Sequence, residues 1–186
     1  MTEQSGIRAT DVEHLRRIRK LLAGGDRRSI GRSAQVVADV LAHPERFGAV
    51  IDAISDDDPV IRMRAADVAE KITAQRPELL GAYKRLLLDD LARASQAEVR
   101  WHVAQMLPRL TLAEGDHHAA VAILVDYLDD HSRIVTVNAM QALTDFARAD
   151  ASLRPRVIEL LEPLTERGSP AIRARGRKLL AALRTR

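Results

Sequence analysis

The chain repeats itself, and this repetition constrains the fold more than any other feature of the sequence. The segment HPERFGAVIDAI at residues 43–54 matches RPELLGAYKRLL at residues 76–87 through a Pro-Glu pair and a Gly-Ala pair, with a spacing of 33. A looser copy, RPRVIELLEPL, occupies residues 154–164. Proline is tolerated in the first turn of a helix, and glutamate favours the positive end of the helix dipole. Each copy therefore predicts the start of an amphipathic helix.

A second periodic element alternates with the first and also predicts a helix. It covers residues 59–72, 97–107, 132–143 and 170–180, where apolar residues recur with helical spacing. Aligning Ile61 with Val99, Ile134 and Ile172 gives spacings of 38, 35 and 38 residues. Two alternating helices per repeat are typical of an α-solenoid.

The predicted helices cover residues 10–23, 31–42, 44–55, 59–75, 77–92, 96–109, 116–129, 132–148, 153–167 and 170–184. We expect an all-α fold, a right-handed α-α superhelix of about four to five helical hairpins plus an N-terminal helix. Residues 1–186 should form a single solenoid domain, with residues 1–9 flexible and residues 10–29 forming a capping helix and turn. Asp116 is a candidate N-cap for the helix at 116–129, and Asp56 or Asp58 for the helix at 59–75.

Composition excludes several classes of protein. The chain has no cysteine, which excludes a disulfide scaffold, a thiolate metal site and a cysteine nucleophile, and fits a reducing cytoplasm. The polar N-terminal segment lacks the apolar region of a signal peptide, and no stretch approaches the length of a membrane span. We expect a cytoplasmic protein that is not embedded in a membrane.

The net charge of +3 is unevenly distributed. Residues 1–35 hold eight basic and four acidic residues, a net charge of +4, and residues 167–186 hold seven basic residues and no acid. Residues 36–166 carry 14 basic and 22 acidic residues, a net charge of −8. The sequence thus predicts basic ends around an acidic middle, which favours a protein partner over a nucleic-acid duplex along the whole length.

The segment DDDPVIRMRAADVAEKI at residues 56–72 resembles a HEAT repeat. That family places an Asp in the turn and a Val/Ile-Arg pair after a Pro, followed by spaced alanines. The resemblance implies that Asp56 and Arg62 form part of a ladder between neighbouring repeats. In the other copies Ala94, Val135 and Arg167 replace one member of this pair, with Asp129 as the turn Asp of the third copy. The resemblance covers roughly residues 30–184 and implies an armadillo-type or HEAT-type solenoid.

The only tryptophan, Trp101, lies off the apolar stripe of its predicted helix and aligns with Met63 and Thr136. In HEAT-like stacks the second helices line the concave surface, so Trp101 is a candidate anchor for a partner, and packing between repeats is the alternative. The other candidates are His102 and Gln105 beside it, with Met63 and Asp67 on helix 59–75. The leading hypothesis is a non-enzymatic scaffold that binds another, unidentified protein on this concave face.

Basic residues at the two ends support an alternative, which is binding to a nucleic-acid backbone. The phosphate-contact candidates at the C-terminal end are Arg173, Arg175, Arg177 and Lys178. The N-terminal candidates include Arg17, Arg19, Arg27 and Arg28. Solvent-exposed polar faces on the first and last helices are the favoured explanation of both groups.

An enzyme is the third hypothesis and has the least support. The sequence lacks the glycine-rich phosphate-binding motifs and the GxSxG motif, and no nucleophile and base can be paired. His117 and His118 follow Glu114 and Asp116, but adjacent histidines point in different directions on a helix, so an exposed helix start is favoured over a metal site. We predict no catalytic residue, no metal and no cofactor.

Overall fold

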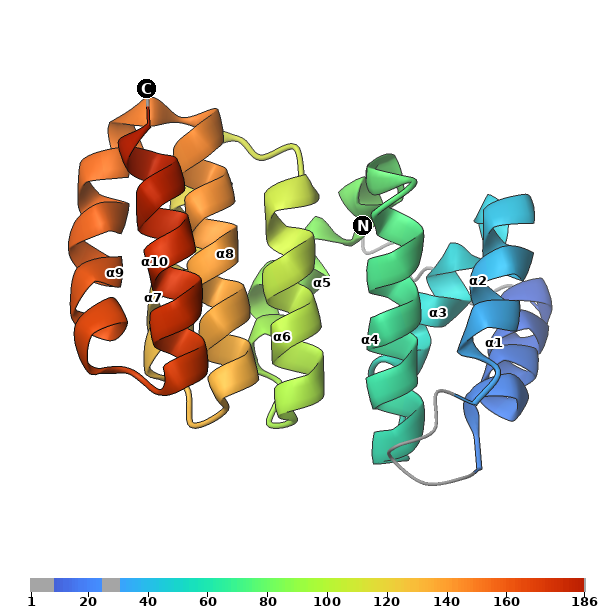
Figure 1. The fold of residues 1–186 in the computed structure, drawn as a ribbon. Helices are drawn as coiled ribbons and strands as arrows, with labels where there is room; N and C mark the ends of the chain where they lie inside the picture. Colours follow the sequence, from blue (N-terminus) through green and yellow to red (C-terminus); the bar gives the residue numbers. More distant parts are fainter. Residues whose placement is uncertain (1–8, 25–30, 186) are drawn as a thin grey trace. The chain divides into compact units, whose positions relative to one another are not determined.

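The computed structural model describes residues 9–24 and 31–185, and every regular element in these two ranges is a helix (Figure 1). The prediction of an all-α fold is therefore confirmed. Residues 1–8, for which flexibility is expected, lie outside the described residues, as do residues 25–29 of the predicted turn. None of the described helices combines the length and apolar character needed to cross a bilayer.

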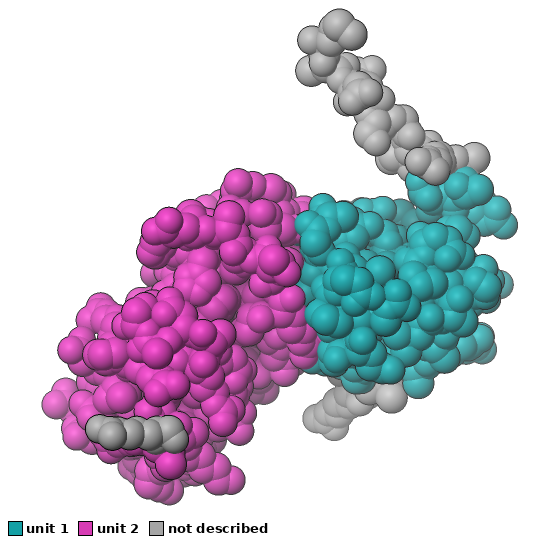
Figure 2. All heavy atoms as spheres, turned by 90° about the horizontal axis from the view of Figure 1, so that it is seen from above, with its two compact units in different colours: residues 1–83 teal, residues 84–186 magenta. Residues whose placement is uncertain are grey.

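The chain divides into two compact units, residues 1–83 and residues 84–186, shown in different colours in Figure 2. In unit 1, α1 (Ala9–Leu22) packs against α3 (Phe47–Ala53), and α2 (Ser33–Ala42) packs against α4 (Pro59–Thr73). The 3-10 turn η1 (Pro44–Arg46) leads into α3, and η2 (Pro77–Tyr83) follows α4. The core of unit 1 includes Ile18, Leu22, Val36, Val40, Phe47, Ile51, Ile61, Val68, Ile72 and Leu80.

Unit 2 contains two layers of helices. One layer, here called the second-helix layer, consists of α6 (Ala97–Met106), α8 (Arg133–Ala149) and α10 (Pro170–Arg184), with α8 between the other two (Figure 1). The first-helix layer consists of α5 (Lys84–Asp89), α7 (Glu114–Asp126) and α9 (Arg154–Arg167). The connecting 3-10 turns are η3 (Leu91–Arg93), η4 (Leu107–Arg109), η5 (Tyr127–Asp129) and η6 (Ala151–Leu153).

The predicted single helix over residues 77–92 is wrong in detail. The chain forms the 3-10 helix η2, the short α5 and the 3-10 turn η3 in succession. Pro77 has no N–H to donate and Gly81 is a poor helix former, so this stretch lacks the continuous helical preference of its neighbours. Residues 44–46 likewise form a 3-10 turn, and the α-helical part of the predicted helix 44–55 begins only at Phe47.

Of the two predicted N-caps, the one for α4 is confirmed and the one for α7 is wrong. Asp58 caps α4 by accepting the N–H of Val60 at 2.8 Å, while the Asp56 carboxylate accepts the N–H of Asp58. The assignment of Asp116 as an N-cap is wrong, because α7 begins at Glu114 and Asp116 lies inside its first turn. The Asp116 carboxylate instead binds Lys84 at 2.5 Å, and this contact lowers its pKa.

The N-caps of the second helices define the repeat register. These residues are Asp58, Gln96, Ser132 and Ser169. The third residue after each N-cap is therefore Ile61, Val99, Val135 or Ile172, and all four are in the core. The alignment that used Ile134 is wrong by one residue: Ile134 is 52% exposed, whereas Val135 is fully buried. Trp101 accordingly corresponds to Met63 and Val137, not to Thr136.

Candidate functional site

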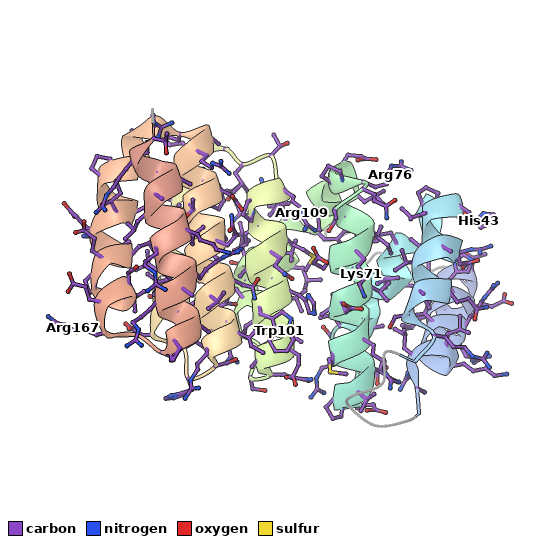
Figure 3. All side chains as sticks on the ribbon, viewed as in Figure 1. His43, Lys71, Arg76, Trp101, Arg109 and Arg167 are labelled. Carbon is purple, nitrogen blue, oxygen red and sulfur yellow. The ribbon has the colours of Figure 1, made fainter. Side chains whose placement is uncertain are left out.

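Trp101 lies on α6 in unit 2, toward the start of that helix (Figure 3). Its side chain is partly exposed, in keeping with a position outside the apolar stripe, and its ring lies 5.5 Å from that of His102. Gln105, one turn further, is also partly exposed. The side chains of Trp101 and Gln105 are therefore accessible to a partner on the surface of the second-helix layer.

His102 is not accessible in the way that the sequence suggests. It is only 8% exposed, and its Nδ1 lies 3.0 Å from the Oε1 of Gln105. The residue follows Val99 by three positions and precedes Val103, so helical geometry places it on the inward side of α6. His102 therefore orients Gln105 instead of presenting a free imidazole to a partner.

Met63 and Asp67 lie on α4, in unit 1. Both are partly exposed, and Asp67 forms an ion pair with Lys71 one turn later, at 2.6 Å. This i,i+4 arrangement is typical of a solvated helix face. These two candidates belong to one unit, and Trp101, His102 and Gln105 belong to the other.

A polar network that the sequence analysis missed joins α8 and α10. Arg175 donates to the Oε1 of Gln141 at 2.6 Å, and the Gln141 amide donates to the Asp145 carboxylate at 2.7 Å. Burial raises the pKa of Asp145, against the opposing effects of the Gln141 hydrogen bond and of the nearby Arg148 and Arg175. The network fixes an amide and two charges on the second-helix layer. Gln141 and Arg175 are 34 residues apart, so no local pattern could reveal their contact.

The C-terminal basic residues divide into two kinds. Arg173, Arg177 and Lys178 are exposed on α10, and none has an ion pair with another described residue. Arg175 is partly buried and engaged with Gln141, while its Nε is buried without a hydrogen-bond partner. Three of the four predicted phosphate-contact residues are therefore available to an anion.

Two of the N-terminal basic residues form ion pairs within unit 1. Arg17 forms an ion pair with Asp39 at 3.4 Å, and Arg19 forms one with Asp56 at 2.6 Å. Arg27 and Arg28 lie outside the described residues. The ion pairs reduce the positive charge that α1 presents to a phosphate backbone.

The residues of the expected HEAT-like ladder make two kinds of contact. Arg62 donates to the main-chain carbonyls of Asp56 and Asp57, at 2.7 and 3.1 Å, whereas the Asp56 carboxylate is bound by Arg19. Arg100 makes equivalent contacts with the carbonyls of Ala94 and Ser95, both at 2.8 Å. This shared pattern confirms that positions 62 and 100 are structurally equivalent.

Arg100 also reaches the following repeat. Its Nε and Nη2 donate to the two carboxylate oxygens of Asp130 at 2.7 and 3.1 Å. Asp130, not Asp129, is therefore the turn Asp of this repeat, and its carboxylate also accepts the N–H of Ser132. Burial alone would raise the pKa of Asp130, but the hydrogen bonds from Arg100 and Ser132 lower it overall.

His117 of α7 has a packing role, whereas His118 is exposed. The His117 ring meets Phe146 edge-on, with 4.9 Å between the ring centroids. Across the described part of the chain, no three His, Cys, Asp or Glu side chains come together as a set that could hold a metal ion.

Comparison with known proteins identifies the fold. No family model matches the chain, and no curated protein matches it in sequence. A designed armadillo repeat protein in complex with the peptide (KR)4 superposes with a TM-score of 0.63 at 16% identity, over 94% of this chain and 83% of that one. A second designed armadillo repeat protein gives 0.62 at 18% identity, over 94% and 84% of the two chains.

An engineered protein known from its crystal structure is similar to the same extent, with a TM-score of 0.62 at 16% identity over 95% of this chain and 81% of that one. At these identities the likeness concerns the fold alone. The chain is an all-α solenoid of armadillo-like helical repeats.

Proposed function

We propose that this chain is a non-enzymatic scaffold that binds a segment of another protein on the second-helix layer of unit 2. The main observation is the pair of large apolar side chains that α6 and α8 leave uncovered there. Trp101 is partly exposed, and the side chain of Ile134 is 52% exposed. Among the described residues, Ile134 and Val12 are the two large apolar residues that are classed as exposed. Tryptophan is enriched among the interface residues that contribute most of the binding energy.

The two apolar residues are close enough for one bound segment to cover both. α6 and α8 are neighbours that run in the same direction (Figure 1). Trp101 is five residues after its N-cap and Ile134 two residues after its own. Neighbouring helices lie about 8–10 Å apart and rise about 1.5 Å per residue, so the two positions are separated by roughly 10 Å.

Polar groups beside this apolar pair would fix the orientation of a bound segment. Gln105 follows Trp101 by one turn, and Gln141 is held in place by Arg175 and Asp145. Fixed amides can donate to and accept from a peptide main chain at a small entropic cost. The (KR)4 complex of the designed armadillo repeat protein is a precedent for peptide binding by this fold.

We also infer that the repeats are of the HEAT type. The motif at residues 56–72 carries this inference, and the link from Arg100 to Asp130 supports it because it joins consecutive repeats.

The binding surface can be tested with a peptide library selected on the full chain. Trp101 is the only tryptophan, so its emission reports directly on binding at this site. Selected peptides should shift this emission in the unmodified chain. In fluorescence anisotropy with the labelled peptides, Trp101→Ala should weaken their binding by about 30-fold, equivalent to a hot-spot loss of about 2 kcal/mol. Val12→Ala, which alters the other exposed apolar residue, should have no effect. Peptides that bind Trp101→Ala as tightly as the unmodified chain would contradict the assignment.

Binding of a nucleic-acid backbone remains the alternative, and the exposed cations of α10 favour it. Arg173, Arg177 and Lys178 project from one helix and could contact phosphates. Fluorescence anisotropy with a labelled duplex should then show affinity that falls steeply with salt. Replacing all three residues by Gln should reduce the salt dependence, and absence of binding at low salt would exclude this function.

A further inference from the structure

In the second half of helix α7, residues 119–125, every side chain is apolar, so this part of the helix is apolar around its whole circumference. Ala120 and Leu124 are buried against the rest of unit 2, while Ala119 and Ala122 are exposed on the other side. A surface helix of a globular protein normally carries polar residues opposite its buried stripe, and a helix that is apolar all round is normally covered all round. The outer face of residues 119–125 therefore has the composition of an interface.

A groove runs along this face between α7 and the elements α5 and η3. Its volume is about 390 Å³. Leu88, Ala92 and Tyr127 form part of its lining, together with Ala122 and Ile123 of α7. Burial raises the pKa of Tyr127, and its hydroxyl donates to the Ala92 carbonyl at 2.6 Å. The Tyr127 hydroxyl is thus engaged internally, and the apolar side chains of the lining form the floor of the groove.

The rim of this groove is acidic. Asp89 ends α5 and Asp126 ends α7, and both line the groove. Asp90 and Asp129 are exposed close by in the chain. Arg93 is the basic residue of the lining, and its guanidinium donates to the main-chain carbonyl of Asp89. A ligand that complements this rim carries positive charge.

We propose that this groove, here called the acidic groove, docks a basic amphipathic helix of a partner protein. The exposed alanines of α7 allow another helix to approach closely, and the volume accommodates leucine-sized side chains. Lys or Arg residues that flank the apolar stripe of the partner would face Asp89 and Asp126. This mode of recognition inserts the apolar face of a helix into a hydrophobic groove, and charge selects the partner.

The acidic groove is separate from the surface proposed above for a protein segment. It lies on the first-helix layer of unit 2, whereas Trp101 and Ile134 lie on α6 and α8 of the second-helix layer. Failure of one proposal therefore leaves the other intact, and Trp101→Ala should not alter binding to the groove.

The test uses the full chain and a fluorescein-labelled model peptide of about 14 residues, with leucines at helical spacing and flanking lysines. We expect a Kd below about 300 μM by anisotropy. A peptide with Glu in place of each Lys should bind at least about fivefold more weakly, since the rim would repel it. A higher Kd for the lysine peptide, or equal binding of the two peptides, would overturn the proposal.

The site within the chain is tested with Ala122→Lys, which places a cation and a long side chain in the groove. The matched control is Ala181→Lys, at an exposed alanine of α10. Ala122→Lys should weaken binding of the lysine peptide at least about fivefold, and Ala181→Lys should leave it unchanged. Circular dichroism verifies that both variants fold. A smaller effect of Ala122→Lys, or an equal effect of the control, would refute the assignment of the groove.

Discussion

The ion pair between Arg100 and Asp130 should make a measurable contribution to stability, and Asp130→Asn tests it. The side chain of Asp130 is 9% exposed and that of Arg100 is 18% exposed, so neither charge is fully solvated. Asparagine retains the Oδ1 that accepts the N–H of Ser132. Its amide nitrogen, however, would face an N–H of Arg100. The substitution therefore removes one hydrogen bond and the counter-charge of a partly buried guanidinium.

Removing one partner of a buried ion pair costs about 3–5 kcal/mol, and the residual exposure of Arg100 places the expected loss at about 3 kcal/mol. For a chain of this length each kcal/mol lowers the melting temperature by roughly 2–4 °C, so Asp130→Asn should melt roughly 6–12 °C lower. The measurement is thermal unfolding followed by circular dichroism, together with urea unfolding at neutral pH.

The neighbouring Asp129 provides a matched control, because it is exposed in the same turn. Asp129→Asn should change the free energy of unfolding by less than about 0.5 kcal/mol. Since the pKa of Asp130 is lowered in the folded state, its contribution is complete above the unfolded pKa of about 3.9 and is lost as the pH falls through the lower folded value. Equal melting temperatures of Asp130→Asn and the unmodified chain, or equal losses in the two variants, would refute the reasoning.

Further substitutions test the packing of each unit. Arg64 is 1% exposed and donates to two main-chain carbonyls at the end of α1. Arg64→Met should therefore lower the free energy of unfolding by about 2–4 kcal/mol and speed hydrogen exchange in α1. Unchanged exchange in α1 would contradict this. Gly176→Ala should destabilise by about 1–3 kcal/mol in urea unfolding, because its Cβ would overlap Thr165, whose hydroxyl is fixed by a hydrogen bond. Gly115→Ala, where nothing lies within 4 Å of the added Cβ, should instead stabilise by about 0.4–1 kcal/mol.

Much of the fold follows from local information in the sequence. Apolar periodicity sets which stretches form helices, and this signal is strong for long amphipathic segments such as α8 and α10. It is weaker where Pro77 and Gly81 interrupt the pattern, and there the predicted helix is a series of shorter 3-10 and α segments. Periodicity describes which face is apolar, but it does not distinguish an α-helical turn from a 3-10 turn.

The register of the third repeat shows a limit of a different kind. Ile134 and Val135 are both β-branched and apolar, so the residue types alone do not indicate which one is buried. The N-cap decides, because Ser132 begins the helix one position later than the alignment assumed. The Asp-Ser spacing at residues 130–132, which mirrors Asp56 and Asp58, was the available signal for this register.

The candidate site depends on contacts that local sequence does not encode. Whether Arg175 is free to bind a phosphate depends on Gln141, a residue in the preceding repeat. Arg64 is likewise engaged about 40 residues away, at the end of α1. An arginine on a solvated helix face and an arginine that contacts another repeat have the same local sequence pattern. Only the packed structure therefore shows which of the two a given arginine is.

The two layers of unit 2 present unlike chemistry, and this difference limits what each can bind. The second-helix layer offers an aromatic side chain, fixed amides and the cations of α10, while the acidic groove offers an apolar floor with a negative rim. A basic amphipathic helix fits the groove but would meet Arg173 and Lys178 on the other layer. A segment chosen by Trp101 would in turn gain little from Asp89 and Asp126. If both proposals hold, saturation of the groove with the lysine peptide should leave the Trp101 emission response to library peptides unchanged, and the chain would join two different partners without competition between them.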